Sequence, residues 1–292
     1  MTIRRVGIVA KHNLVAASEH VSRLGAWLEE RGLTVVYERE TLALTRSAGA
    51  RSRTASRDEL PGEVDLIVLL GGDGTLLAVA AAIAKACRDI PILGVNFGSL
   101  GFLTEIRIDE LTASLESVLE GTATFDARAM LAADVSRKDA RVDSQVVLND
   151  VVFTKGALSR MIELSVSVSG GFVTCVKADG LIVASATGST AYNLAAGGPI
   201  VHPMVDALVL TPIAPHTLTN RPVVIPGQAE VEVRPGGAAD EVFVTYDGQT
   251  GYTLHEGDVV RVRKSDLMLR LVKAPTRSYF EVLREKLKWG ER

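Results

Sequence analysis

Cysteine and histidine are both scarce in this sequence. The 292-residue chain contains only Cys87 and Cys175, together with five histidines. Two cysteines so far apart form neither a disulfide framework nor a Cys-x-x-Cys zinc site, so we expect two buried, reduced thiols. No His-x-x-x-His pair occurs, which argues against a zinc-hydrolase helix and against a permanent transition-metal site.

An excess of positive charge and long apolar runs are also missing. Lys and Arg total 32 against 35 Asp and Glu, a net charge of −3, so no basic surface is expected to hold nucleic acid. The apolar runs fall well short of the roughly 20 residues that cross a bilayer, and the start has no apolar signal-peptide core. We therefore expect a cytoplasmic protein with neither a nucleic-acid nor a membrane partner.

Hydrophobic residues make up 47% of the sequence, enough for a core in each of two domains.

The first part of the chain alternates strands with helices. Alternation of this kind predicts an open parallel sheet with right-handed crossovers. The segment Thr41 to Arg57 has no periodicity and is expected to be a mobile loop. Strands are expected at 5–10, 33–38, 64–70 and 91–95, and helices around Val21, Leu24 and Leu28 with a stop at Gly32, at 75–87 and at 109–121.

The later part is rich in short β-branched segments separated by turn signals. Two alternating runs flank Gly170 and Gly171 and predict a hairpin in which both glycines are free to adopt positive φ. At the end, Phe280, Leu283 and Leu287 share one face of a helix that we expect to return to the first domain. The predicted fold class is therefore α/β plus all-β, with a Rossmann-like domain at 1–122 plus the helix at 275–292, and a β-sandwich-like domain at 123–274.

A glycine-rich loop, "LLGGDGTLL" at 69–77, follows the expected strand at 64–70. On its own the spacing fits a tight turn. Ligands of open α/β sheets bind at the carboxyl ends of strands, and helix N-termini attract anions, so a phosphate site is the alternative. The loop matches neither the P-loop nor the G-x-G-x-x-G pattern. Asp73 beside phosphates indicates phosphoryl chemistry with a divalent metal, or it is an Asx-turn aspartate.

Four segments together resemble one family. "GGDGT" occurs in diacylglycerol kinases, phosphofructokinases and NAD kinases. "ADGLIVASATGSTAYNLAAGGPI" at 178–200 closely resembles the second signature of bacterial NAD kinases, as do "LGVNFGSLGFL" at 93–103 and "HTLTNRPVVIP" at 216–226. With "LND" at 148–150 and the order of elements, the resemblance covers nearly the whole chain.

The resemblance implies a reaction. NAD kinases transfer the γ-phosphoryl group of ATP, or of polyphosphate in some members, to the 2′-hydroxyl of the adenosine ribose of NAD. Asp73 matches the catalytic aspartate that accepts the hydroxyl proton. Mg²⁺ is expected to arrive with ATP, so no protein metal site is expected. The family borrows groups across subunits, which implies a homodimer or homotetramer.

The same resemblance implies the binding residues. Asn149 and Asp150 match an Asn-Glu pair that holds the adenosine, although Asp is one methylene shorter than Glu. Arg160 and Lys177 either offset phosphate charge or are solvated surface residues. Asn96 and Phe97 are expected both to pack and to line the NAD groove. The remaining candidates are Gly72, Gly74 and Thr75 at the phosphates, Asp179 reaching a base or carboxamide edge from a neighbouring subunit, Thr187, Thr190 and Asn193 as hydrogen-bonding groups, Ala191 as a close backbone approach, Tyr192 as a stacking ring, and Leu194, Ala195 and Gln249 as further contacts.

Two rival functions share part of this pattern. A lipid kinase of the diacylglycerol kinase type would also have "GGDGT" and two domains, but "TGSTAYN" at 187–193 is not its motif. A non-catalytic dinucleotide sensor would share every glycine without requiring Asp73. An enzymatic assay separates these functions.

Overall fold

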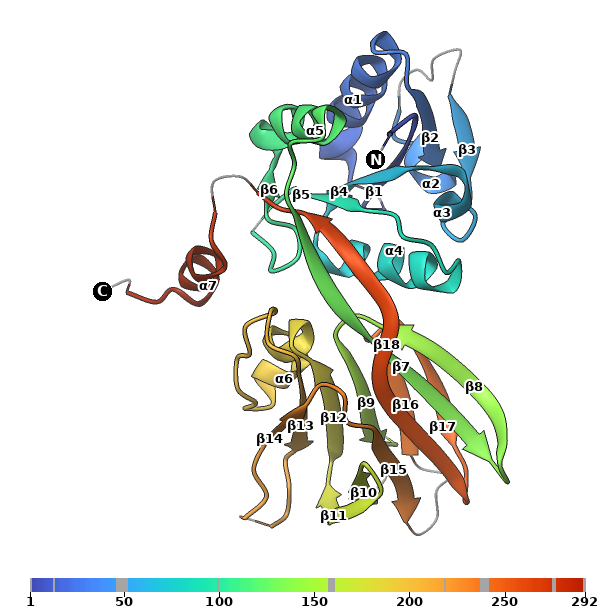
Figure 1. Cartoon of the computed structure of the whole chain (residues 1–292), viewed down its shortest axis with the longest axis vertical. Coiled ribbons are helices and arrows are strands. Elements are labelled where there is room, and N and C mark those ends of the chain that lie inside the picture. Colours follow the sequence, from blue (N-terminus) through green and yellow to red (C-terminus); the bar gives the residue numbers. More distant parts are fainter. Residues whose placement is uncertain are drawn as a thin grey trace. The chain divides into compact units, whose positions relative to one another are not determined.

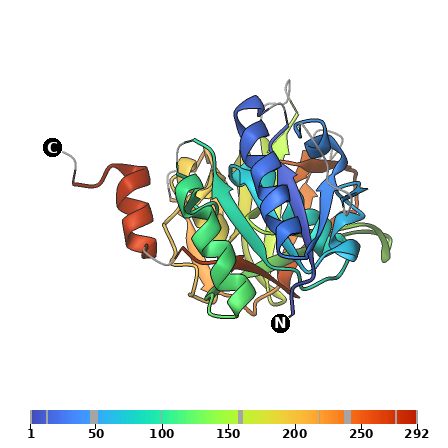
Figure 2. The same cartoon turned by 90° about the horizontal axis from the view of Figure 1, so that it is seen from above.

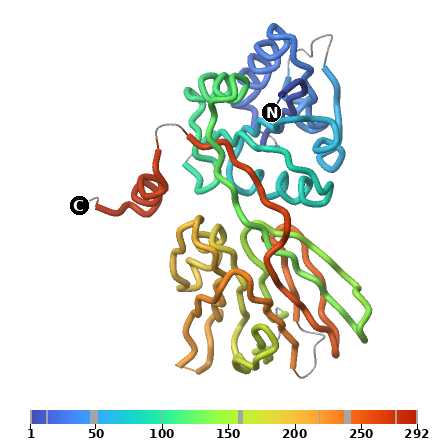
Figure 3. Tube along the Cα trace, viewed as in Figure 1, coloured from blue at the N-terminus to red at the C-terminus, as the bar shows by residue number. Residues whose placement is uncertain are grey.

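The chain forms two compact units. The computed structural model describes residues 2–12, 14–45, 52–98, 100–156, 161–217, 219–236, 242–274 and 277–290. Unit 1 comprises Met1–Ala127 and Leu269–Arg292, and unit 2 comprises Arg128–Met268. The chain leaves unit 1 within β7 (Phe125–Arg137) and returns within β18 (Asp258–Val272), as the trace in Figure 3 shows. Each unit has its own core.

Unit 1 is built on a parallel sheet with the strand order β5-β4-β1-β2-β3. All six residues of β4 are buried, as its continuous apolar run predicts for a strand covered on both faces. The short β6 and the end of β18 both pair parallel to β5. The strands are β1 (Arg5–Ala10), β2 (Thr34–Glu38), β3 (Arg53–Ala55), β4 (Leu66–Gly71), β5 (Ile92–Asn96) and β6 (Ile106–Arg107).

Helices cover both faces of this sheet. Figures 1 and 2 show α1 and α5 side by side on one face and α4 on the other. Val21, Leu24 and Leu28 of α1 are buried, and Gly32 behind it has a φ of 77°, which confirms the predicted face and stop. The helices of unit 1 are η1 (Val15–Ala17), α1 (Ser18–Glu30), α2 (Arg39–Leu42), α3 (Leu60–Glu63), α4 (Asp73–Lys85), η2 (Ile108–Glu110), α5 (Leu111–Glu120) and α7 (Tyr279–Leu287).

The segment predicted as a loop from Thr41 to Arg57 contains regular structure. It holds the end of α2 and the strand β3, which pairs with β2. Thr41 is fully buried, and its hydroxyl accepts a hydrogen bond from the Ala10 amide at 2.8 Å. The prediction was wrong because backbone pairing and one buried hydroxyl supply order that local composition does not reveal. Residues 46–51 lie outside the described residues.

The C-terminal helix α7 begins with a capping box at Ser278 and belongs to unit 1. Its buried residues are Val282 and Leu283, whereas Phe280 is 58% exposed. The predicted face is therefore confirmed at Leu283 and, in part, at the half-buried Leu287, but was wrong at Phe280. Within unit 1, Glu285 lies 3.5 Å from Arg107. No described helix is long and apolar enough to span a membrane.

Unit 2 is a sandwich of two antiparallel sheets (Figure 1). One sheet has the order β14-β13-β12-β9-β16-β17, and the other has β11-β10-β15-β18 followed by β7 and β8. Buried residues of both sheets, including Phe153 and Leu164, form one core. The further strands are β8 (Ala140–Val147), β9 (Asp150–Lys155), β10 (Ile162–Val168), β11 (Gly171–Ala178), β12 (Gly180–Ser185), β13 (Ala207–Ile213), β14 (Val223–Pro226), β15 (Val231–Gly236), β16 (Val242–Tyr246) and β17 (Thr250–Leu254).

The predicted hairpin is present as β10 and β11, with one change at its turn. The residues with positive φ are Ser169 at 49° and Gly170 at 81°, so of the two glycines free to adopt positive φ only Gly170 does. The turn lies one residue earlier because strand pairing starts at Gly171 opposite Val168. Positive φ at two successive residues matches the right-handed twist of the paired strands.

Both cysteines are free and exposed, so the prediction of buried thiols was wrong. Cys87 follows the last turn of α4, where its φ is 49°. Cys175 lies on the edge strand β11, and its Sγ donates to Glu163 at 3.1 Å. A helix end and an edge strand both face solvent, whatever the average burial of cysteine.

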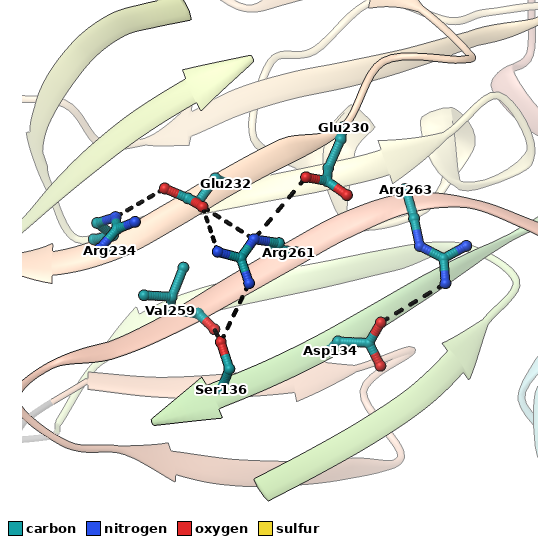
Figure 4. Close-up of polar contacts among 8 residues, drawn as sticks. All are labelled: Asp134, Ser136, Glu230, Glu232, Arg234, Val259, Arg261 and Arg263. Carbon is teal, nitrogen blue, oxygen red and sulfur yellow. Dashed lines mark hydrogen bonds and ion pairs between the residues drawn. The ribbon is translucent and has the colours of Figure 1, made fainter. Parts of the chain in front are cut away.

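Charged side chains cover the face of β15, β18 and β7 that is drawn in Figure 4. Arg261 lies 3.0 Å from Glu232 and 4.0 Å from Glu230, and Arg263 lies 3.8 Å from Asp134. These side chains are partly exposed, and each such pair typically contributes less than about 1 kcal/mol. The face is therefore a solvated surface that carries both signs of charge.

Candidate functional site

The glycine loop connects β4 to α4. Gly71 ends the buried strand, Gly72 is the extended N-cap residue, and Asp73 is the first residue of the helix. The Thr75 amide donates to the Gly72 carbonyl at 3.0 Å. The Gly72 carbonyl thus closes the first turn, and Asp73 and Gly74 carry the amides at the N-terminus of α4, where a helix attracts anions.

The Asp73 carboxylate accepts four hydrogen bonds from the loop at 101–104. Oδ2 accepts from the Phe102 amide at 2.8 Å. Oδ1 accepts from the Leu103 and Thr104 amides at 3.1 Å each and from the Thr104 hydroxyl at 3.0 Å. A Cβ on Gly101 would lie 2.1 Å from Oδ1, so only glycine fits there. Asp73 therefore binds a second loop instead of closing an Asx turn, and Oδ2 keeps a lone pair for another donor.

Gly72 and Gly74 have no packing reason to be glycine in the described structure. A Cβ on either would meet no atom within 4 Å, and neither residue has positive φ. Glycine inside a helix costs roughly 0.5–1 kcal/mol relative to alanine. By contrast, a Cβ on Gly71 would lie 3.1 Å from the Thr75 hydroxyl. The open backbone at Gly72 and Gly74 leaves space for a ligand to approach the helix N-terminus.

Asn96 and Phe97 lie where β5 ends. Asn96 is buried, and its amide donates to the Thr104 hydroxyl at 3.3 Å, so Thr104 contacts both Asn96 and Asp73. Phe97 packs against the core of unit 1, with its ring edge-on to His20 at 5.2 Å. Both residues also line an open pocket of about 280 Å³ with Gly98, Leu100, Arg107, Ile108, Asp109 and Glu285.

In unit 2, the Asp247 carboxylate binds three successive backbone amides. It accepts from Leu148 at 2.8 Å, from Asn149 at 2.7 Å and from Asp150 at 3.0 Å. Asp247 and Gly248 have φ values of 50° and 63°, which form the turn between β16 and β17. The sequence marks this Asp-Gly pair as a turn, but no local signal shows that its carboxylate reaches a segment 97–99 residues earlier.

The other side of the same segment is held by Ser185 and Gly188. The Ser185 hydroxyl donates to the Leu148 carbonyl at 2.6 Å and accepts from the Gly188 amide at 3.0 Å. A Cβ on Gly188 would lie 2.0 Å from the Asn149 carbonyl oxygen. The segment Leu148 to Asp150 is therefore held from both sides, and the chemistry-bearing side chains of Asn149 and Asp150 project from a fixed backbone.

The buried Asp150 carboxyl lies close enough to the half-buried Asp247 to respond to its charge. Burial, and then the charge of Asp247, raises the pKa of Asp150 to about 7. Burial also raises the pKa of Asp247, while its three backbone donors lower it. The amide bonds favour the ionised form of Asp247, and a pKa of about 7 favours the protonated form of Asp150 below neutral pH.

The loop with the "TGSTAYN" motif comprises η3 (Thr187–Thr190) and α6 (Tyr192–Ala195). Asn193 is fully buried, donates to the Ser189 and Pro199 carbonyls at 2.9 and 3.0 Å, and accepts from Thr211 at 2.6 Å. Asn193 therefore holds the loop from inside. Tyr192 is 45% exposed and presents its ring to solvent. Thr187 is buried, Thr190, Ala191 and Leu194 are half-buried, and Ala195 is exposed.

Three of the remaining candidates lie at the surface of unit 2. Asp179 lies 2.8 Å from Lys155, and Lys177 lies 3.1 Å from Glu163. Gln249 is exposed beside the turn that carries Asp247. Arg160 lies outside the described residues. Among the described residues there is no group of three or more acidic, histidine or cysteine side chains able to hold a metal ion.

Comparisons with known proteins agree in both halves of the chain. Residues 6–123 match the family model of the ATP-NAD kinase N-terminal domain, and residues 148–274 match that of the C-terminal domain. The chain is 48% identical to the NAD kinases of Syntrophotalea carbinolica and Geobacter sulfurreducens, over 99% of this chain and 100% of each relative.

Two solved structures are also similar. Yeast NADH kinase complexed with NADH has a TM-score of 0.90 and 25% identity, covering 100% of this chain and 89% of that one. An NAD kinase from Archaeoglobus fulgidus in complex with ATP has a TM-score of 0.74 and 26% identity, covering 96% and 99%.

Proposed function

The chain belongs to the NAD kinase family, and we propose that it transfers the γ-phosphoryl group of ATP to the 2′-hydroxyl of the adenosine ribose of NAD. The observation that carries this mechanism is the Asp73 carboxylate, oriented by four donors beside a glycine backbone with open space. The products are NADP and ADP.

Asp73 is the general base of this proposal. The ribose 2′-hydroxyl donates a hydrogen bond to the open lone pair of Oδ2, its oxygen forms the new bond to the γ-phosphorus, and the bond to the ADP oxygen breaks. The proton passes to Asp73. In a loose transition state this proton moves late, so the main task of the carboxylate is to orient the nucleophile. The four donors serve that task because they fix the direction of Oδ2.

Magnesium is expected to accompany ATP. Mg²⁺ in kinases is held by substrate phosphates and one or two carboxylates, and it neutralises phosphate charge when bound. The one carboxylate of the described loop, Asp73, is assigned to the ribose hydroxyl in this proposal, so the ion would be held mainly by the nucleotide.

The NAD-binding residues come from unit 2 in this proposal. Asn149 and Asp150 hold the adenosine ribose, and the half-exposed ring of Tyr192 stacks on a base. Asp179 reaches a neighbouring subunit, which implies a homo-oligomer. Asn193 acts through the shape of its loop, because both of its amide donors are used inside the protein.

One assay tests the reaction. The protein is incubated with ATP, Mg²⁺ and NAD or NADH, and NADP is detected with an NADP-specific dehydrogenase. Formation of NADP that depends on ATP supports the proposal. Phosphorylation of diacylglycerol without NADP would indicate the lipid kinase, and NAD binding without any product would indicate the sensor.

A glycine substitution tests the loop itself. Gly72→Ala meets open space in the described structure and is expected to leave the melting temperature nearly unchanged. If ATP phosphates approach this backbone, kcat/KM for ATP falls by about tenfold or more, because the methyl group occupies their path. Gly62→Ala in α3, which also meets open space, is the matched control. Equal kinetics for the two variants would argue against a phosphate site at Gly72.

A further inference from the structure

We propose that Asp247 is a positioning residue for NAD: it acts through Asn149 and Asp150, whose backbone it holds in register, and does not touch the reacting atoms. This inference rests on the proposed function, because it assigns Asn149 and Asp150 to the nucleotide. Neither the glycine loop nor the "TGSTAYN" motif includes Asp247. The contacts that carry the inference are its three bonds to the amides of Leu148, Asn149 and Asp150.

The three amides are where β9 begins. Asp150 is the first residue of β9, so the amides before it are not part of the strand ladder. A buried amide needs an acceptor, and Asp247 supplies one carboxylate for all three. The bond from the Asp247 amide to the Asp150 carbonyl at 3.0 Å closes the arrangement. The turn between β16 and β17 therefore sets where β9 starts and in which direction the Asn149 and Asp150 side chains leave the backbone.

The conformation of Asp247 suits this task. Its φ of 50° lies in the left-handed region, which Asp and Asn adopt more readily than most residues. Asn at this position would keep the turn. Its side-chain NH₂ group, however, cannot accept hydrogen bonds from the backbone amides. The variant Asp247→Asn therefore weakens the hold on Leu148 to Asp150 without changing the backbone demand of the turn.

Asp247 also determines the charge beside Asp150. Asp150 lies on β9 between β12 and β16, where its partner on β12 is Ala184. On the β16 side the titratable groups are Tyr246, whose hydroxyl donates to Asp143 at 2.9 Å, and Asp247. Asp247 is the charge that raises the pKa of Asp150, after burial. A ribose hydroxyl donates best to an ionised Asp150. NAD affinity should therefore increase as the pH rises through the pKa of Asp150.

The experiment compares Asp247→Asn with Asp139→Asn in the full chain. Asp139 also lies in a hairpin turn with positive φ, at 64°, and its exposed side chain makes no hydrogen bond among the described residues. For Asp247→Asn we expect the KM for NAD to rise by about tenfold or more, with kcat and the KM for ATP within about threefold. The pH at which the KM for NAD changes should also become lower, because Asn carries no charge that raises the pKa of Asp150. Asp139→Asn should match the unchanged protein.

Two outcomes would overturn the proposal. One is an unchanged KM for NAD in an active Asp247→Asn variant. The other is a KM for NAD raised equally at every pH, which would indicate a general loss of structure. Hydrogen exchange of the unchanged protein decides the matter if the variant does not fold. Protected amides at 148–150, with exchange no faster than in the centre of β12, would support the proposal, and freely exchanging amides would contradict it.

The controls separate this inference from the proposed function. If the unchanged protein makes no NADP from ATP and NAD, the proposed function fails whatever Asp247 does. If it makes NADP and Asp247→Asn behaves like Asp139→Asn, only the positioning role fails.

Discussion

Two carboxylates, one in each unit, bind backbone in the same way. Asp73 of unit 1 accepts from the amides of three successive residues, Phe102 to Thr104, and Asp247 of unit 2 accepts from Leu148 to Asp150. In both cases a carboxylate reaches a segment far away in sequence and replaces the strand or helix partners that those amides lack. Charge-assisted bonds of this kind are stronger than neutral ones.

The surroundings of the two carboxylates differ. Asp73 is half-buried at a helix N-terminus, beside Gly72 and Gly74 with open space around their backbone. Asp247 lies in a tight turn, and its neighbour is the buried carboxyl of Asp150. The proposals give these similarly bonded acids different roles, with Asp73 orienting the substrate and Asp247 holding the backbone. The number of hydrogen bonds therefore does not by itself distinguish the proposed general base from the proposed positioning residue.

The largest expected effect is on turnover at Asp73. Asp73→Asn should lower kcat by about 10²–10⁴-fold, the usual loss when a general base is removed, while NAD binding changes only a few-fold. Steady-state kinetics and direct NAD titration measure the two quantities. Asp58→Asn is the control, because this exposed acid pairs only with Lys85 among its described partners. An unchanged kcat in Asp73→Asn would remove the distinction between the two carboxylates.

The next effect is on stability at Asp150. Its pKa of about 7 in the folded chain exceeds its ordinary value of 3.8, so the folded state holds a proton that the unfolded state releases between these values. Stability therefore falls as the pH rises from about 4 to 7, by up to about 4 kcal/mol for this one group. The uncharged Asp150→Asn variant lacks this loss.

Thermal unfolding of Asp150→Asn at several pH values measures this effect. The variant should be more stable than the unchanged protein at pH 8, and the difference should shrink toward pH 5. At the same time its KM for NAD should rise, because a ribose ligand is lost. A difference in stability that does not depend on pH would show that Asp150 does not titrate in this range.

The smallest effect is expected at Thr104. Thr104→Val removes one of the four donors to Asp73 and the hydroxyl that accepts from Asn96, but leaves the carboxylate in place. Loss of one such bond typically costs about 1 kcal/mol, so kcat should fall only several-fold. Thr112→Val on the exposed side of α5 is the control. If kcat falls as far as in Asp73→Asn, the orientation of the Asp73 carboxylate accounts for most of its contribution to kcat.

Hydrophobic patterns and the glycine that ends a helix were interpreted correctly from the sequence. The buried run of β4, the apolar face of α1 and the stop at Gly32 all appear where they were predicted. Signals that depend on surroundings failed. Cys87 and Cys175 are exposed because one follows a helix end and the other lies on an edge strand, and local composition shows neither position. The segment from Thr41 contains β3 because that strand pairs with β2, and local composition does not reveal a pairing partner.

The candidate site was predictable only in part for the same reason. Motif resemblance identified Asp73, Asn149 and Asp150 as site residues, and these remain predictions about function. It did not identify Asp247 or the role of Ser185, whose contacts join segments far apart in the chain. It also treated Asn193 as a ligand-binding group, whereas the structure places its amide among three internal partners.

The amino-acid sequence by itself determined the two kinds of architecture and the family of this chain, because hydrophobic period, turn residues and motifs are local properties. Only the tertiary structure decided which acids are held by backbone amides, which buried acid has a raised pKa and which glycines border open space. Those properties depend on the dielectric and the partners around a group, and these exist only after distant segments have come together.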